Sequence, residues 1–380
     1  MGFVRSYKFR VYPSKTQEKQ MLQHLWLAKN LWNELLEHCK KMYEEFGYFP
    51  TKGTMQLMAK NCGLFSQTQQ EISHRLYASV IRVFRMKQQG KICGFPRFKS
   101  FDRMKSLHYP QNGIGFHLEK KLRVNPFGEI AIKKHREING NIKTLTLKKE
   151  ASGKWFAIFC AGEPKKRPAA NSGKPVGIDL GLLNFAALST GEIIHNPRHL
   201  RRYEQKLAVF KKRFSRKKKK SRNRHRAKLK VARIYGQIAN SRSDFLHKLS
   251  KRFVSDYSLI VLEKLASKEM SEQNFGKSIN DAGWIMFANM LCYKAEEAGS
   301  RVVFVNPIDT TKECSSCGTK TSKSLAERIH VCSFCGLNLD RDVNAARVIL
   351  KRATAGTAGS NASGNETIVS SMKEEAASVS

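Results

Sequence analysis

The chain is poor in acidic residues and contains no long apolar run. Asp and Glu together number 31 against 69 Lys and Arg, which gives a formal net charge of +38 over 380 residues. No apolar stretch reaches the ~18 residues that a membrane-spanning helix needs, and the N-terminus has no signal-peptide core. Because both features are missing, we do not expect a membrane-spanning protein. The excess of positive charge favours a polyanionic partner, and nucleic acid is the expected one.

A disulfide framework is also missing. The chain has nine cysteines, and five of them are scattered without the regular spacing of a disulfide scaffold. We therefore expect reduced thiols in a cytosolic protein. These five are Cys39, Cys62, Cys93, Cys160 and Cys292.

The other four cysteines form two CxxCG motifs near the C-terminus. Cys314 and Cys317 belong to the first motif, and Cys332 and Cys335 belong to the second. Two such knuckles can surround one tetrahedral metal ion, and the glycine after each knuckle allows a tight turn. All four ligands are supplied by the chain, so we predict one structural Zn²⁺ rather than a catalytic one.

The first part of the chain predicts a small β-barrel interrupted by helices. Residues 3–12 alternate between apolar and polar side chains, as a half-buried strand does. Ser14 and Gln17 form the sequence signature of a capping box, and helical patterns continue to about Lys87. Short strand patterns separated by turns then run from 94 to 162, so a barrel closed by the first strand is expected.

The second part predicts an α/β domain. A linker rich in Pro, Lys and Gly at 164–175 precedes the buried strand pattern VGIDLG at 176–181. The expected order from there is three strands, helix, strand, helix, strand and helix. The residues after 352 are mostly Ala, Gly, Ser and Thr, so we expect a disordered tail.

Three acids stand out by their positions in this pattern. Asp179 lies in the first buried strand, Glu263 ends a later apolar strand, and Asp342 starts the last helix. A carboxylate in an apolar strand is costly unless a cation neutralises it. Three carboxylates at one end of a sheet are suited to two Mg²⁺ or Mn²⁺ ions, which can hydrolyse a phosphodiester.

Each acid also has a simpler explanation. Asp179 sits in a glycine-flanked turn, and Glu263 could be a surface acid at a strand end. Asp340 and Asp342 could both act as helix N-terminal acids that interact with the helix dipole. Their joint appearance in this order of strands and helices is more specific than any one of them alone.

Two segments are candidates for nucleic-acid contact. Residues 201–233 hold seventeen Lys or Arg and one acid, and predict two basic helices joined near 217–220. The segment GFPRFK at 94–99 mixes aromatic and basic side chains, including Arg97 and Lys99, which suits stacking on bases and pairing with phosphates. The alternatives are a solvated helical face and an ordinary loop that packs two Phe residues.

The motifs together closely resemble the TnpB family, the RNA-guided nucleases of insertion sequences and ancestors of type V CRISPR effectors. VGIDLG at 176–181 resembles the first RuvC motif and VLEKL at 261–265 the second. CSSCG, CSFCG and DRDVNAA resemble the zinc ribbon and the third RuvC motif. GFPRFK, DFLHKL at 244–249 and DAGW at 281–284 also resemble family signatures, so the resemblance covers nearly the whole chain.

The resemblance implies an α/β plus β architecture. It implies an RNase H-like RuvC nuclease domain with an inserted zinc ribbon, preceded by an OB-like β-barrel (the wedge) that carries a helical recognition insertion. The boundaries expected are 1–13 and 94–164 for the wedge, 14–93 for the helical insertion, 165–175 for the linker, 176–308 and 338–352 for the RuvC domain, 309–337 for the zinc ribbon, and 353–380 for the tail.

The resemblance also implies an activity. Asp179, Glu263 and Asp342 match the catalytic acids, with Asp179 bridging two Mg²⁺ ions, and Asp340 does not match. The expected partners are a guide RNA from the transposon end and double-stranded target DNA, bound by a monomer in the prokaryotic cytoplasm. The candidate nucleic-acid contacts are Arg97, Lys99, Gln111, Asn112, Lys217, Lys218, Lys219, Lys220, Arg222 and Arg224.

Three other functions remain open at this point. A nuclease-inactive, RNA-guided repressor would lack one or more of the three acids. A transposase that joins DNA ends would use the same fold but leaves the other family signatures unexplained. A zinc-ribbon protein that only binds nucleic acid leaves Asp179 and Glu263 unexplained.

Overall fold

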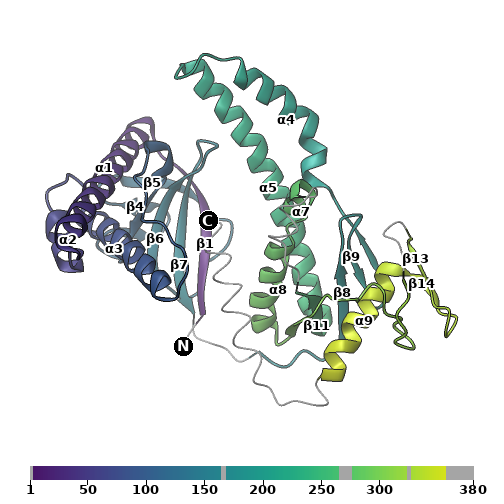
Figure 1. Ribbon diagram of the computed structural model, residues 1–380. Helices are drawn as coiled ribbons and strands as arrows, with labels where there is room; N and C mark the ends of the chain where they lie inside the picture. The colour runs from purple at the N-terminus through teal and green to yellow at the C-terminus, as the bar shows by residue number, and fades with distance from the viewer. Residues whose placement is uncertain (1–2, 164–167, 265–275, 323–326, 357–380) are drawn as a thin grey trace. The chain divides into compact units, whose positions relative to one another are not determined.

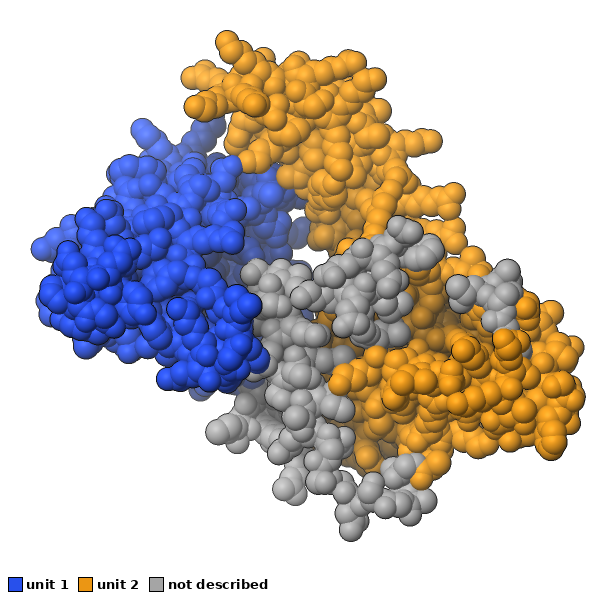
Figure 2. All heavy atoms as spheres, viewed as in Figure 1, with its two compact units in different colours: residues 1–165 blue, residues 166–380 orange. Residues whose placement is uncertain are grey.

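The computed structural model describes residues 3–163, 168–264, 276–322 and 327–356 (Figure 1). It divides into two compact units, Met1–Lys165 and Lys166–Ser380 (Figure 2). Each unit has its own hydrophobic core. Of the tail expected at 353–380, residues 353–356 form the end of the last helix instead, and the rest lies outside the described residues, as do parts of the expected linker and zinc ribbon.

The first helix of the first unit begins and ends where the local sequence provides caps. Ser14 is the N-cap of α1 (Lys15–Phe46), and its capping box with Gln17 is present as predicted. Gly47 ends α1 in the left-handed conformation at φ 74°, which glycine adopts without strain. Two further helices follow, α2 (Lys52–Met58) and α3 (Ser66–Gln88).

The strands of the first unit form one seven-stranded antiparallel sheet, a nearly closed barrel, with the order β2-β6-β7-β1-β5-β4-β3. The N-terminal strand β1 lies in the middle and pairs with β7 and β5. Tyr7, Phe9, Trp155 and Phe159 are among the largest fully buried side chains. The strands are β1 (Phe3–Tyr12), β2 (Ser106–Tyr109), β3 (Phe116–Leu118), β4 (Leu122–Val124), β5 (Gly128–Lys133), β6 (Asn141–Lys149) and β7 (Trp155–Glu163), with the short 3-10 helix η1 (Phe101–Arg103) before β2.

The second unit is built on a five-stranded sheet with the order β10-β9-β8-β11-β12. The pairs β10–β9 and β9–β8 are antiparallel, whereas β8–β11 and β11–β12 are parallel. A separate two-stranded sheet joins β13 and β14. The strands are β8 (Lys174–Leu180), β9 (Asn184–Leu188), β10 (Ile193–His195), β11 (Tyr257–Glu263), β12 (Arg301–Val305), β13 (Ile329–Val331) and β14 (Asn338–Asp340).

Helices cover both faces of this sheet. Ile260 and Leu262 belong to the core shared with α5 and α8, whereas Val261 packs with Ile349 of α9. Because neighbouring strand residues face opposite sides, α5 and α8 lie on one face and α9 on the other. The helices are α4 (His199–Ser215), α5 (Arg222–Asp256), α7 (Gly276–Ala282), α8 (Trp284–Ala298) and α9 (Arg341–Gly356).

The basic segment forms a long hairpin of α4 and α5 (Figure 1). The turn between them falls at 216–221, as the sequence predicts, but α5 runs to Asp256, well beyond the expected end near 233. The reason is a continuous apolar stripe that includes Ile234, Ile238, Leu246 and Phe253. None of the helices in the described part is both long and apolar enough to cross a membrane.

Candidate functional site

Asp179 and Glu263 lie at the same end of neighbouring strands. In the parallel pair β8–β11, Ile178 lies opposite Leu262, and each acid is the next residue along its strand. Strands that run in parallel bring equivalent ends to one edge of the sheet. The two carboxylates are close enough that the charge of Glu263 acts on the pKa of Asp179.

Asp342 reaches the same place because α9 approaches β8 very closely. A Cβ atom at Gly177 would lie only 2.1 Å from the carbonyl oxygen of Ala346 and 2.8 Å from the backbone nitrogen of Leu350. Only glycine tolerates this contact of helix and strand. Asp342 lies one turn before Ala346, at the start of α9. The close packing therefore places Asp342 beside the strand that carries Asp179.

Asp340 and Asp342 have different roles in the structure. One oxygen of Asp340 accepts hydrogen bonds from the backbone N–H groups of Asp342 and Val343, at 2.9 and 3.1 Å. Asp340 is thus the N-cap of α9. Asp342 instead accepts hydrogen bonds at 3.3 Å from the guanidinium of Arg341. The carboxylate of Asp342 can bind a further cation, whereas the carboxylate of Asp340 accepts the hydrogen bonds that cap the helix.

The environment of Asp179 suits a bound cation. Burial raises the pKa of Asp179 well above its usual value, and the charges of Glu263 and Asp342 raise it further, although Arg341 opposes them. Within the described residues, its carboxylate has neither a hydrogen bond nor an ion pair. A carboxylate so placed is costly unless a positive charge compensates it. The oxygen ligands of this cluster fit Mg²⁺ or Mn²⁺.

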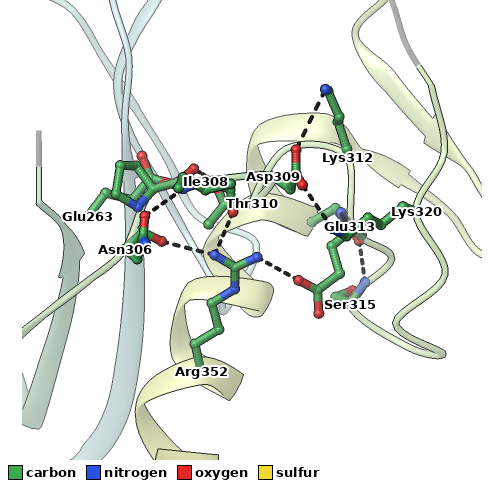
Figure 3. Close-up of polar contacts among 12 residues, drawn as sticks. Glu263, Asn306, Ile308, Asp309, Thr310, Lys312, Glu313, Ser315, Lys320 and Arg352 are labelled. Carbon is green, nitrogen blue, oxygen red and sulfur yellow. Dashed lines mark hydrogen bonds and ion pairs between the residues drawn. The ribbon is translucent and has the colours of Figure 1, made fainter.

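Glu263 is held by a residue that the sequence did not point to. Thr310, which is 2% exposed, donates its hydroxyl hydrogen to Oε1 of Glu263 (Figure 3). Burial raises the pKa of Glu263, while the Thr310 hydrogen bond and the charge of Arg352 act in the opposite direction. Glu263 is therefore a partly buried carboxylate with one oxygen held by the protein.

The four cysteines come together as a ready-made metal site. Their sulfur atoms all lie within 4.8 Å of one another, and they are the only such group of three or more Cys, His, Asp or Glu in the described part of the chain. Gly318 and Gly336 follow the knuckles at φ 80° and 71°. The Thr319 hydroxyl and backbone N–H lower the pKa of Cys317 to about 6, which favours the thiolate that binds metals. The four thiols fit Zn²⁺.

The first knuckle is fastened to α9 by a buried asparagine. Asn344, fully buried in the DRDVNAA motif, accepts a hydrogen bond from the N–H of Ser315 at 2.9 Å and donates one to the carbonyl of Glu313 at 2.8 Å. Sequence reasoning missed this residue. The signal was a polar side chain between the apolar Val343 and Ala345 at the start of a helix.

Arg352 fastens the segment before the knuckle to the same helix. Its guanidinium donates to the carbonyls of Asn306 and Ile308, at 2.9 and 2.8 Å, and pairs with Glu313 at 2.7 Å (Figure 3). Asp309, in the same segment, pairs with Lys320 and Lys312. The residues between β12 and the first knuckle are therefore an ordered strap.

The candidate contacts Arg97 and Lys99 belong to the first unit, on a segment that α1 holds in place. Asn33 exchanges two hydrogen bonds with the backbone of Lys99, at 2.8 and 3.0 Å, and Trp32 donates to the carbonyl of Arg97. The ammonium of Lys99 lies 3.2 Å from the centre of the Trp32 ring, and burial lowers the pKa of Lys99 to about 8. Phe95 stacks on Phe49, so this ring serves the protein's own core.

Gln111 and Asn112 also lie in the first unit, on the connection between β2 and β3. Gln111 accepts a hydrogen bond from Gln67 at 3.3 Å, and Asn112 accepts one from the N–H of Gly113 at 2.9 Å. Both side chains are thus engaged locally, in the unit that also holds Arg97 and Lys99.

The remaining candidates lie in the second unit at the turn of the α4–α5 hairpin. Lys217, Lys218, Lys219, Lys220 and Arg222 are exposed there. Arg224 differs, because it donates to the carbonyls of Phe214 and Lys217 and lies 4.2 Å over the Phe214 ring.

The base of the hairpin is fixed by the acid of the DAGW motif. Asp281, on α7, accepts a hydrogen bond from the N–H of Leu200 and pairs with Arg242 of α5, at 2.8 and 2.9 Å. It thus caps the start of α4 and fastens α5 at the same time.

Known proteins with similar sequences cover almost the whole chain. A protein of Streptomyces pristinaespiralis named "Putative RNA-guided DNA endonuclease" is 30% identical over 372 residues, 93% of this chain and 90% of that protein. The chain belongs to the TnpB family. The Escherichia coli protein named "Putative RNA-guided DNA endonuclease InsQ" is 27% identical over 373 residues, 92% of each chain.

Three family models match successive parts of this TnpB-family chain. The model described as "Probable transposase", for the OrfB protein of IS605, matches residues 158–274, and "Cas12f1-like, TNB domain" matches 284–349. A third, described as "Helix-turn-helix domain", matches residues 1–47, which fold here as β1 and α1.

The fold also has a counterpart among solved structures. The structure described as "Cryo-EM structure of the Cas12f1-sgRNA-target DNA complex" matches with a TM-score of 0.58 at 12% identity, over 92% of this chain and 98% of that chain. The fold of this chain is therefore similar to that of the Cas12f1 chain in that complex.

Proposed function

We propose that this protein is an RNA-guided DNA endonuclease of a transposable element, acting in the prokaryotic cytoplasm. It cleaves target DNA next to a short motif, at a RuvC site that holds two Mg²⁺ ions. The proposal is supported by the register that puts Asp179 of β8 and Glu263 of β11 at the same end of the sheet, by the close approach of α9 to β8, and by the charges of Glu263 and Asp342 acting on Asp179. The names of the relatives and of the matched Cas12f1 complex support the same activity.

The three acids have a defined task in this mechanism. Bound divalent cations supply an activated water and stabilise the leaving oxygen of a phosphodiester. The carboxylates of Asp179, Glu263 and Asp342 hold these cations, Asp340 keeps the start of α9 in place, and Thr310 holds one oxygen of Glu263. The four cysteines hold a structural Zn²⁺ that folds the ribbon and takes no part in the reaction.

The rest of the chain binds nucleic acid in this proposal. The first unit is the OB-like wedge, at 1–13 and 94–164, with the helical recognition insertion at 14–93. The second is the RNase H-like RuvC domain, at 176–308 and 338–352, interrupted by the zinc ribbon at 309–337. A monomer with its net charge of +38 binds a guide RNA from the transposon end, and base pairing with the guide selects the double-stranded DNA target.

Within this proposal the ten candidate contacts are not equivalent. The exposed lysines at 217–220 and Arg222 are available to bind phosphates. Arg224 orders the hairpin turn that presents them. Lys99 and Arg97 bind nucleic acid through their side chains, and α1 already fixes the backbone that carries them. Less conformational entropy is therefore lost on binding.

The decisive test replaces Asp179. We expect Asp179→Ala to lower target cleavage at least about 1,000-fold, equivalent to about 4 kcal/mol in the barrier, while guide RNA and target DNA still bind. Asp244→Asn is the matched control, because Asp244 is an exposed acid of the same unit and its ion-pair partner among the described residues is Lys248, at 2.8 Å. Full cleavage by Asp179→Ala in Mg²⁺ would overturn the assignment.

A second measurement separates a nuclease from an inactive repressor. The protein is purified from cells that carry the flanking DNA of the element, and the RNA bound to it is sequenced. A discrete RNA is expected, and the complex should linearise a plasmid that carries the matching target. A plasmid that is bound but remains intact would favour the repressor.

A further inference from the structure

The strap between β12 and the first zinc knuckle contains one buried hydroxyl, that of Thr310, and it points at a proposed metal ligand. We propose that Thr310 is a positioning residue that fixes the orientation of the Glu263 carboxylate, and that α9 holds Thr310 in place through Arg352 and Asn344. This inference rests on the proposed function, since it concerns how that site is assembled. It names Thr310 and Arg352, which lie outside the motifs, and it gives a role to Asn344 within the DRDVNAA motif.

The hydrogen bond of Thr310 favours the ionised carboxylate. Its hydroxyl oxygen also lies 3.1 Å from the carbonyl of Pro307, but one hydroxyl can donate to only one acceptor at a time. A carboxylate is the stronger acceptor of the two, because hydrogen bonds to charged groups are shorter and stronger. Thr310 thus holds Oε1 of Glu263, and Oε2 makes no hydrogen bond within the residues that the structure describes.

The strap is fastened on both sides of Thr310. Arg352 binds the carbonyls of Asn306 and Ile308 before it, and the carboxylate of Glu313 after it. Asn344 continues this attachment to the backbone of Glu313 and to the first knuckle. Both anchors belong to α9, the helix whose first turn carries Asp342. The position of Thr310 is therefore tied to the helix that supplies another proposed ligand.

This arrangement links the two metal sites. Residues that hydrogen-bond to a metal ligand orient it, and their loss commonly costs about 10–100-fold in metal affinity or activity. Here the residue that orients Glu263 lies at the start of the proposed zinc ribbon, four residues before Cys314. A ribbon that loses its fold would release Thr310 and leave Glu263 free to rotate.

A purely structural role for Thr310 makes a different prediction. If its hydroxyl only satisfied the Pro307 carbonyl, its loss would lower stability without changing affinity for divalent cations. The two roles can be separated with Thr310→Val, which keeps the shape but removes the hydroxyl, and Thr310→Ser, which keeps the hydroxyl. Thr311→Val is the matched control, because Thr311 is the exposed neighbour in the sequence.

The first measurement is Mn²⁺ binding to the full-length protein with its co-purified RNA, monitored by electron paramagnetic resonance. The binding that Asp179→Ala removes defines the acid site. We expect Thr310→Val to weaken that binding about tenfold or more, and Thr310→Ser and Thr311→Val to leave it within about twofold. Zinc content is measured in the same samples and should stay constant.

The second measurement is the cleavage rate as a function of Mg²⁺ concentration. Thr310→Val should need about tenfold more Mg²⁺ for half of its maximal rate, and Thr310→Ser should restore the wild-type value. Unchanged Mn²⁺ binding in Thr310→Val, or an equal loss in Thr310→Ser, would overturn the role of Thr310. Absence of cleavage by the wild-type complex would instead count against the proposed function, because the Mn²⁺ measurement does not depend on cleavage.

Discussion

The cysteine site and the acidic site of the second unit are assembled in opposite ways. The four sulfur atoms are gathered within 4.8 Å by two short knuckles, each closed by its own backbone hydrogen bonds. The acids come from β8, β11 and α9, and they raise the pKa of Asp179 by repulsion. Burial raises the pKa of Cys314 to about 11, so this thiol stays protonated and does not repel its neighbours, whereas carboxylates brought together repel one another. In the proposed function, zinc therefore stabilises the fold of the ribbon, and magnesium compensates the charge of carboxylates that the sheet and α9 already hold.

The largest expected effect comes from breaking the cysteine site. We predict that Cys332→Ser loses zinc and several kcal/mol of stability, because structural zinc sites contribute folding free energy directly. Zinc content is measured by elemental analysis and unfolding by calorimetry. Cleavage should fall as a consequence of the lost fold, because a ribbon without zinc no longer holds Thr310 against Glu263. A variant that stayed fully folded and zinc-loaded would contradict the four-thiolate site.

The acidic site should respond in the opposite direction. We predict that Asp179→Asn abolishes cleavage but makes the Mg²⁺-free, zinc-loaded protein more stable, because it removes a buried carboxylate and its repulsion. The melting temperature should rise by at least ~2 °C, the shift that about 1 kcal/mol produces in a domain of this size. Asp244→Asn, at an exposed acid, should leave it unchanged.

The pH dependence of that gain has a definite sign. The pKa of Asp179 is raised in the folded state, so the folded protein binds more protons than the unfolded chain above about pH 3.9. The free energy of unfolding of the wild type therefore falls as the pH rises toward the pKa that Asp179 has in the folded protein. Above that pKa the carboxylate is ionised and its full destabilising effect remains. The advantage of Asp179→Asn should be larger at pH 8 than at pH 5.5. Adding Mg²⁺ should stabilise the wild type alone.

The smallest effect separates the two acids at the start of α9. We predict that Asp340→Ala costs about 1 kcal/mol through loss of the helix cap, and that Asp340→Asn costs little because Asn is an equally good cap. Both variants should cleave, unlike Asp342→Ala. Thermal unfolding and cleavage rate give the two readouts. Loss of cleavage in a stable Asp340→Asn variant would make Asp340 a metal ligand as well.

The parts of the site that could be predicted are those encoded locally. A CxxCG knuckle fits into five residues, and an acid in an apolar strand is visible in its own segment. Thr310, Asn344 and Arg352 could not be found in this way, because each acts on a partner about 29 to 47 residues away along the chain. The side-chain hydrogen bonds of Thr310 and Asn344 exist only once β12, the strap and α9 are packed together.

The basic residues show the same limit. Their number predicted a polyanionic partner, but composition does not distinguish a side chain that faces solvent from one that holds a turn. Arg224 caps the backbone at Phe214 and Lys217, while the neighbouring Lys219 is exposed. The length of α5 was also underestimated, since its second half was assigned to a separate motif and not to a continuing apolar stripe.

The contact of Gly177 with α9 has a consequence for how the sequence can change. Where helix and strand meet main chain against main chain, the spacing between Asp179 and Asp342 is set by backbone atoms, not by the volume of the side chains around them. Apolar residues elsewhere in the core can then be exchanged for others of similar size with little effect on that spacing. The apolar core residues can therefore differ widely among relatives, provided that glycine is kept at the position of Gly177.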